Sequence, residues 1–446
     1  MKSSQGKTGP KTPPRATEPV PAPETAAERA PRYWITLVVV LIGFWGMMAA
    51  RPDWLSYIGI RHFGVWFIDS YAILASNDAL AQGLDVHAAN PLDYFGRPHV
   101  YSPWWLGLGR LGFTRADNFW LGFTLGLAFL AVAVDWLRPR TRGELLWSLA
   151  VLLSPCILMA VERANNDLVI FLLLAPVVPC LLAEHRGWHV GAILLIAVAA
   201  GLKFYPAAAA LLLLVPGTTR EVRWRVAGGV LALAIVIASI ASGYLRVRNL
   251  LPPVDGPMNF GAIHALTRLG LGGLLPGLVT AGLIVVAWWR ADIFRGWATP
   301  EVVRRRWLHA VLGMAVLCGC FFTSTNFAYR WVFALWIAPW LWWIARATEA
   351  PLAVRRLAWT TMGLLVAALW IDPLTLGILT QWLAPLPEPV VARTANLVYV
   401  IEQPLVWALF VCLLGFLTEF LRTGWRPLAG LAAKPEPAPA GSKGPA

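Results

Sequence analysis

Polar residues that could do chemistry stand in four short segments of an otherwise strongly apolar chain. The first segment runs from Phe67 to Ala72 and contains Asp69. A carboxylate near a membrane surface could act as a general base, or it could be the solvated cap of an interfacial helix. The residue type alone leaves both roles open for Asp69.

The second segment is the turn from Glu162 to Asp167, where two acids, a cation and two amides are close in sequence. Asn and Asp favour turns and helix N-termini, so Asn165, Asn166 and Asp167 could simply cap the helix that follows. Arg163 and its acidic neighbours also stand at membrane depth, where an unpaired charge is costly and usually functional. The turn is therefore either a cap or part of a binding site.

The third segment, from Gly201 to Pro206, places Lys203 inside an apolar stretch. A lysine there could snorkel to the membrane surface. Its position at a break marked by Pro206 favours a second role, which is to bind an anion.

The fourth segment is the turn from Thr323 to Arg330. Arg330 could bind a phosphate with two parallel hydrogen bonds, or it could anchor the chain at the membrane interface. His264, in the 244–269 segment, is a further candidate, although a lone histidine in a loop is more often structural. Carboxylate, amide and cation together suit a lipid-phosphate leaving group and a hydroxyl acceptor.

The composition shows which elements must position these residues. The 446 residues are 58% hydrophobic and 14% charged, against roughly 45–50% and 25% in ordinary soluble domains. Many of the 25 Trp residues lie at the ends of apolar runs, as membrane-interface anchors do. The five Cys residues lie inside apolar runs without metal-ligand spacing. These features predict an all-α polytopic membrane protein.

We predict about twelve transmembrane segments from the apolar runs. They are 33–50, 118–136, 144–161, 166–183, 188–202, 206–216, 226–243, 270–289, 307–323, 331–345, 357–371 and 403–421. The two segments on either side of Lys203 could be halves of one broken helix. A membrane domain is thus expected over 33–425, with disordered tails at 1–32 and 426–446.

Arginine clusters predict the orientation of the chain. They occur at 138–142, 220–225, 304–306 and 355–356, and all fall on one side of the predicted topology. By the positive-inside rule this side is cytoplasmic, and it also holds both tails. The net charge of +13 therefore does not imply nucleic acid.

The opposite side holds the polar segments and the loops between spans. The largest is 51–117, a first external loop in which we expect interfacial helices, and 372–402 is another. With no organelle signal in the sequence, the expected location is a bacterial cytoplasmic membrane. The absence of a P-loop, a dinucleotide fingerprint, a haem motif or HExxH leaves no predicted cofactor. The several carboxylates of the first loop could hold a divalent metal, but no paired ligand spacing supports one.

The ordered pattern of these segments resembles the membrane-embedded C-type glycosyltransferases (GT-C). The closest resemblance is to glycosyltransferase family 87, the polyprenyl-phosphate-mannose-dependent type also catalogued as a domain of unknown function (DUF2029). The residues that carry it are Asp69–Ala72, Gly83–Val86, Val100–Pro103, Arg163–Asp167 and Gly201–Pro206. One departure is Val86-His87, where the family commonly has Pro-Tyr.

The resemblance implies transfer of a mannose-like hexose from a polyprenyl-phosphate donor to a hydroxyl of a glycolipid or glycan on the outer face, with inversion. Asp69 would be the general base. Lys203 and Arg330, with Arg163, would bind the lipid phosphate, while Asn166 and Asp167 would orient sugar hydroxyls or Arg163. The other expected substrate contacts are Tyr71, Asp85, Tyr101, Asn165, Tyr205, His264 and Asn326.

A transporter or flippase for a lipid-linked sugar or another anionic substrate is the alternative. Lys203 and the break at Pro206 would then mark a substrate path. The two halves of the chain show no convincing inverted repeat, and a large acidic loop suits an active-site wall better than a gate.

Overall fold

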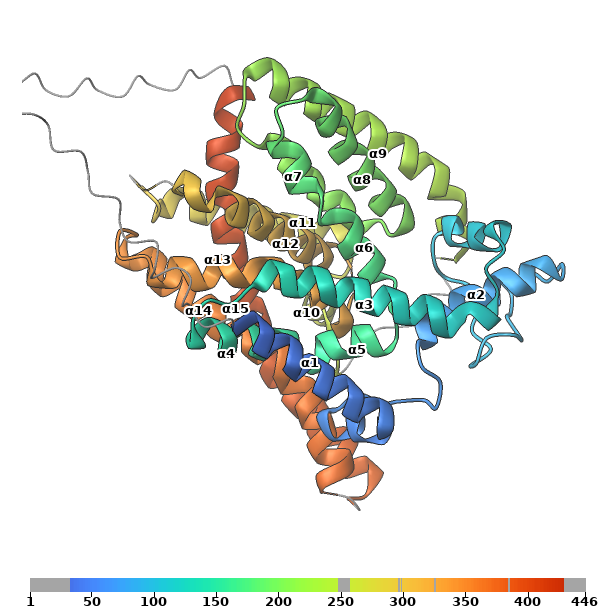
Figure 1. The fold of residues 1–446 in the computed structure, drawn as a ribbon. Coiled ribbons are helices and arrows are strands. Elements are labelled where there is room, and N and C mark those ends of the chain that lie inside the picture. Colours follow the sequence, from blue (N-terminus) through green and yellow to red (C-terminus); the bar gives the residue numbers. More distant parts are fainter. Residues whose placement is uncertain are drawn as a thin grey trace, which may run out of the picture.

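The computed structural model describes residues 33–247, 257–295, 297, 299–324, 326–383 and 386–428 (Figure 1). These residues are mostly helical, which confirms the predicted class. Helix α15 continues to Leu428, slightly beyond the predicted end of the membrane domain. The tails at 1–32 and 429–446 lie outside the described residues.

Seven helical stretches among the described residues are long and apolar enough to cross a membrane. They are α1 (Tyr33–Ala50), η4 with α3 (Arg115–Leu137), α9 (Thr219–Val247), α11 (Leu274–Ala291), η6 with α12 (Glu301–Thr323), α14 with η8 (Leu352–Trp382) and most of α15 (Glu388–Leu428). The apolar helices are those of a membrane-embedded protein, but the predicted count of twelve spans is not confirmed.

The remaining apolar runs form shorter pieces, and prolines explain the breaks. The 144–161 run is split before Pro155, and its two helices are bent by 56°. Pro176 and Pro206 stand at two further breaks. Proline disrupts a helix interior but is tolerated in its first turn. The pieces are α4 (Arg142–Leu152), α5 (Pro155–Glu162), α6 (Asp167–Leu174), α7 (Val177–Leu182), α8 (Arg186–Leu202), η5 (Tyr205–Leu214) and α13 (Ala334–Arg346).

Burial separates a central helix from peripheral ones. In the apolar window of α12, 83% of the residues are buried, whereas the windows of α11, α9 and α1 are 6%, 11% and 17% buried. Such extensive exposure of apolar side chains is expected where lipid surrounds a helix. Helix α12 packs against α13, η5, α15 and α11, so it forms the middle of the bundle.

The segment 51–117 contains the helices expected for it, namely η2 (Pro52–Ile58), α2 (Ile68–Ala81), η3 (Pro103–Leu111) and η4 (Arg115–Asp117). Asn77 links α2 to η3 within this segment. Its amide donates to the Trp105 carbonyl over 3.0 Å and accepts from the Gly109 N–H over 2.8 Å. Helix α2 lies at the right of Figure 1, with α4 at the left and α3 running between them.

The segment 372–402 differs from the predicted loop. Asp372 lies on α14 (Leu352–Gly377), which continues into the π-helix η8 (Ile378–Trp382), and Glu402 lies on α15. Both side chains are buried. A charged residue lowers the local hydropathy, so the predicted spans stop next to Asp372 and Glu402. Inside a helix bundle two buried carboxyl groups can face each other, and the helices then continue through both residues.

A two-stranded antiparallel ribbon brings two distant polar turns together. Strand β1 (Asn259–Phe260) pairs with β2 (Asn326–Phe327), and Phe260 lies opposite Asn326. Helix α10 (Ala262–Arg268) follows β1, and the 3-10 helix η7 (Ala328–Phe333) follows β2. The ribbon therefore sets where η7 begins, and η7 carries Arg330.

The arginine-rich segments lie near one another. Arg306 interacts electrostatically with Arg140, and Arg225 interacts with Arg304. Arg142 and Arg346 line one shared cavity. Members of three of the four arginine clusters, 138–142, 220–225 and 304–306, thus lie near one another.

Candidate functional site

The start of α2 is joined to the 162–167 turn through the backbone. The Phe67 N–H donates to the Glu162 carbonyl over 2.9 Å, and the Asp69 N–H donates to the Arg163 carbonyl over 3.1 Å. Phe67 and Ala164 have left-handed backbones, with φ of 63° and 43°. This conformation costs a residue with a side chain about 1–2 kcal/mol. Such strain persists where surrounding contacts over-determine it, often at functional sites.

The side chain of Asn165 links Asp69 to Asp167. Its amide N–H donates to Asp69 Oδ2 over 2.6 Å, and its carbonyl oxygen accepts from the Asp167 N–H over 2.9 Å. All three side chains are buried, and Asp167 is fully inaccessible. One amide therefore fixes the predicted base relative to the next carboxylate.

Asp167 is the centre of a cationic cluster. Its Oδ1 accepts hydrogen bonds from Lys203 Nζ and from the Tyr205 hydroxyl, and its Oδ2 lies 3.8 Å from Arg330 Nε. The Arg330 guanidinium also lies 4.8 Å from the centre of the Tyr205 ring. Two cations therefore share one carboxylate, and Asp69 is a second negative charge within electrostatic range of Lys203.

Asn326 holds Arg330 in place. Its side-chain oxygen accepts from Arg330 Nη1, and its amide donates to the Cys320 carbonyl over 2.8 Å. Asn326 is fully buried on β2. The late polar turn thus reaches the cluster through the ribbon.

Part of the first loop closes over this region. Ser102 donates to the Gly201 carbonyl over 2.6 Å, and the Trp105 indole donates to the Leu202 carbonyl over 3.1 Å. Tyr101 lies within electrostatic range of Asp69 and Tyr329. Burial, with a further contribution from the Asp69 carboxylate, raises the pKa of Tyr101. Its hydroxyl is therefore a neutral hydrogen-bond donor at ordinary pH.

Several buried polar atoms of the turn have no hydrogen-bond partner among the described residues. Both amide atoms of Asn166 are in this state, as are Glu162 Oε2 and Asp167 Oδ2. Buried polar groups are nearly always satisfied by protein or water, so such exceptions in one place point to a bound ligand or water. They make the turn the best candidate for contacts with a polyhydroxyl or anionic molecule.

For three predicted contacts, the interactions found among the described residues lie elsewhere. Asp85 is exposed and accepts from the His87 N–H over 3.1 Å, so it stabilises its own turn. Tyr71 interacts with Arg115. His264 is buried on α10, which packs against α11 and α12.

Two neighbours of the cluster had no recognisable signal in the sequence. His62 Nδ1 lies 2.8 Å from Glu162 Oε1, and this pair is almost fully buried. Arg97 forms two hydrogen bonds with Asp93, of 2.9 and 3.0 Å, and interacts electrostatically with Asp69. His62 and Glu162 are 100 residues apart, so no local sequence pattern predicts that they pair.

No protein-family model, curated protein or solved structure matches this chain. Within the described part of the chain, no three His, Cys, Asp or Glu side chains are grouped so as to hold a metal ion. What the cluster offers is a buried carboxylate, an orienting amide, unsatisfied polar atoms and two cations.

Proposed function

We propose that this protein is a membrane glycosyltransferase of the GT-C type. It moves a mannose-like hexose from a polyprenyl-phosphate donor to a hydroxyl of a glycolipid or glycan acceptor, with inversion. The observation that carries the proposal is the link through Asn165, which holds Asp69 over 2.6 Å and also binds the backbone of Asp167, the partner of Lys203 and Arg330.

In the proposed reaction, Asp69 takes the proton of the acceptor hydroxyl as that oxygen attacks the anomeric carbon. The bond between that carbon and the phosphate oxygen breaks, and the lipid phosphate leaves with the electron pair. A positioned general base typically accelerates such a step by roughly 10²–10⁴-fold. Attack from the face opposite the phosphate inverts the anomeric configuration.

The two cations of the cluster support a phosphate leaving group. Lys203 and Arg330 both lie beside the single carboxylate of Asp167. In a buried site, preorganised cations stabilise charge that develops in the transition state. Arg163 could add to this stabilisation, because its Nε lies 3.9 Å from Glu162 Oε2 and makes no hydrogen bond to described residues.

The sugar contacts follow from the unsatisfied atoms. Asn166 presents a donor and an acceptor, both buried. Sugar hydroxyls both donate and accept, so they can satisfy such a pair. Two hydroxyl groups lie near these atoms: the Tyr205 hydroxyl donates to Asp167, and Tyr101 lies within electrostatic range of Asp69.

The proposed setting is a bacterial cytoplasmic membrane with both termini in the cytoplasm and the cluster at the outer face. The gathering of Arg140, Arg225, Arg304 and Arg306 supports one strongly basic end, which the positive-inside rule places in the cytoplasm. A polyprenyl chain could then lie against the exposed apolar helices.

A transfer assay tests the proposal. Purified protein in nanodiscs is incubated with radiolabelled polyprenyl-phosphate mannose and a membrane lipid extract, and labelled products are separated. Asp69→Asn should lose transfer by roughly 10²–10⁴-fold. Asp135→Asn is the matched control, because Asp135 is exposed and pairs only with Arg138 among the described contacts.

The outcomes separate the alternatives. Full activity in Asp69→Asn at wild-type expression would exclude Asp69 as the base. Movement of labelled sugar across vesicles without a new glycosidic product would instead favour a transporter or flippase.

A further inference from the structure

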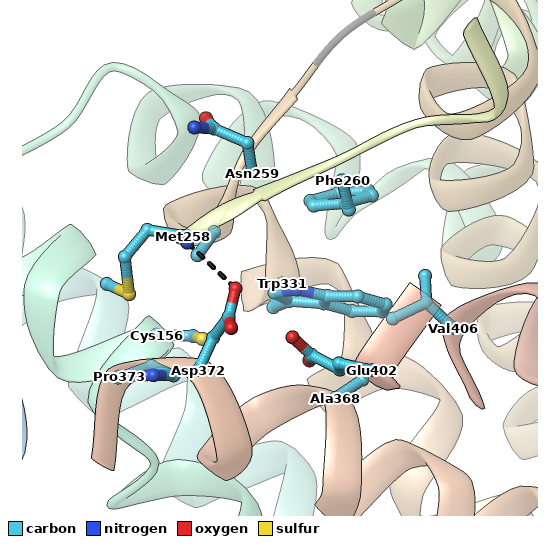
Figure 2. Close-up of a pocket in the computed structure, with 11 residues that line it drawn as sticks. Cys156, Met258, Asn259, Phe260, Trp331, Ala368, Asp372, Pro373, Glu402 and Val406 are labelled. Carbon is cyan, nitrogen blue, oxygen red and sulfur yellow. Dashed lines mark hydrogen bonds between the residues drawn. The ribbon is translucent and has the colours of Figure 1, made fainter. Parts of the chain in front are cut away.

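A second pair of ionisable side chains lies inside the helices, apart from the cluster around Asp69. Asp372 of α14 and Glu402 of α15 are only 6% and 4% exposed, and their carboxyl groups face one another (Figure 2). They line a cavity of about 10 Å³, which has room for about one water molecule. Among the described residues that line it, Cys156 of α5 is the only other ionisable one.

The pair holds one proton. Both carboxyl groups are buried and face one another across this small cavity (Figure 2). Two ionised carboxylates this close in a buried site are strongly unfavourable, so one of them is protonated and can donate to the other. Asp372 Oδ2 also accepts from the Met258 N–H over 2.9 Å (Figure 2). Because that N–H stabilises an ionised carboxylate, Glu402 is the better holder of the proton.

The Met258 backbone depends on this contact. Met258 has a left-handed conformation, with φ of 67°, which residues with a side chain rarely adopt. Its N–H is fixed by Asp372, and its carbonyl accepts from the Ala328 N–H over 2.9 Å. Met258 thereby aligns the start of β1 with the first residue of η7.

The ribbon continues this alignment to Arg330. Phe260 pairs with Asn326, and the Phe260 ring stacks on Trp331 with a centroid separation of 4.6 Å. Asn326 in turn accepts from the Arg330 guanidinium. A continuous series of contacts therefore joins the carboxyl pair to the cation that faces Asp167.

We propose that Asp372 and Glu402 are positioning residues, which share one proton and hold the β1–β2 ribbon so that Arg330 meets the phosphate of the lipid donor. This inference rests on the proposed function for its effect on catalysis. Its structural part, the hold on the ribbon, stands separately.

The shared proton gives the arrangement a distinctive pH dependence. Loss of that proton at alkaline pH would place two negative charges in contact, which is strongly unfavourable in a buried site. The other residues that line the cavity from β1 and η7 are uncharged, and Cys156 is the only ionisable group from α5. Separation of the two carboxylates would release Met258.

Hydrogen exchange at residues 257–260, followed by mass spectrometry in nanodiscs, measures the hold on the ribbon directly. Glu402→Ala should speed exchange there and raise the donor KM roughly tenfold, the scale of one lost hydrogen bond to a charged group. Glu402→Gln keeps a donor toward Asp372, so it should behave like the wild type at neutral pH. It should also lack the alkaline rise in exchange, after correction for intrinsic rates, that the wild type shows.

The variants also guard against ambiguous results. Glu349→Gln alters an exposed carboxyl group and should match the wild type throughout. Wild-type exchange in Glu402→Ala, or an unchanged alkaline rise in Glu402→Gln, would overturn the proposal. If Glu402→Ala does not fold, the comparison of Glu402→Gln with the wild type still decides. If no sugar transfer is found, the exchange measurement still tests the pair, so the two failures are distinguishable.

Discussion

The Asn165 side-chain amide lies 2.6 Å from the Asp69 carboxylate, although the two residues are 96 positions apart in the chain. The contact is reinforced by the backbone, because the Asp69 N–H donates to the Arg163 carbonyl. Asp69 is thus held both through its side chain and through its main chain. In the proposed enzyme this arrangement orients the base before the acceptor arrives, which is how positioning contributes to catalysis.

Asn165→Ala is expected to lower kcat by roughly ten- to hundredfold. A hydrogen bond to a charged group contributes about 1.5–3 kcal/mol, and each 1.36 kcal/mol corresponds to about tenfold in rate. Asn165→Asp should be slower still, since two adjacent carboxylates resist ionising together. Steady-state transfer kinetics measure both variants. An unchanged kcat in Asn165→Ala would show that Asp69 does not depend on this amide.

Asp167→Asn should destabilise the protein more than Lys203→Met does. Removing the charge of Asp167 leaves Lys203 and Arg330 without their shared carboxylate, and breaking a buried pair in this way costs roughly 3–5 kcal/mol. In Lys203→Met, Asp167 keeps Arg330 and Tyr205 as partners. Thermal unfolding in detergent measures the difference. Equal melting temperatures for the two variants would contradict this account.

Lys203→Met should instead raise the donor KM, because one of two cations for the lipid phosphate is lost. Lys203→Arg keeps the charge and provides the matched control. If the donor KM is unchanged in Lys203→Met, Lys203 has only a structural role.

The cluster could be predicted in part because its residues interrupt apolar runs. Polar residues stand at breaks between apolar segments, namely Asp69, the 162–167 turn, Lys203 and Arg330. The spans of a membrane protein end near the two membrane surfaces, so such breaks are expected to lie there. Tertiary pairing was not accessible in the same way. His62 with Glu162, and Asp372 with Glu402, join residues far apart in sequence, and no helical or strand periodicity relates them.

The number of spans could not be predicted for a related reason. A hydropathy profile records apolar length but not direction, so the run broken at Pro155 counts as one straight span although its halves are bent by 56°. The break at Lys203, by contrast, was predicted from Pro206, and it separates α8 from the 3-10 helix η5. Asp85 accepts from the His87 N–H in its own turn, and the sequence does not distinguish such a local contact from a substrate contact.

Gly59→Ala should be clearly more destabilising than Gly83→Ala. Both glycines have left-handed backbones, with φ of 82° and 78°, so both variants incur a strain of about 1–2 kcal/mol. A Cβ at Gly59 would also overlap the backbone carbonyl of Pro373, whereas one at Gly83 would meet no atom within 4 Å. Melting temperatures of the two variants in detergent isolate the steric part. Similar losses would mean that η2 can move away from α14.

Acid should weaken the fold through His99, which lies in the segment after α2. Burial lowers the pKa of His99 from 6.5 to about 4. In the unfolded chain, His99 takes up a proton near pH 6.5. In the folded chain it takes up that proton only near pH 4. His99 therefore contributes to the free energy of unfolding above about pH 6.5. This contribution, on the order of 3 kcal/mol, is lost as the pH falls from about 6.5 to about 4.

His99→Gln removes the titrating group, so its melting temperature should fall less steeply with acid across this window. His185→Gln is the matched control, because His185 is exposed and its replacement should leave the wild-type dependence intact. Asp93 affects stability only at lower pH. Burial raises the pKa of Asp93, but hydrogen bonds from Arg97 outweigh burial and hold this pKa below 3.8. Parallel melting curves for wild type and His99→Gln across the window would show that another group causes the acid sensitivity.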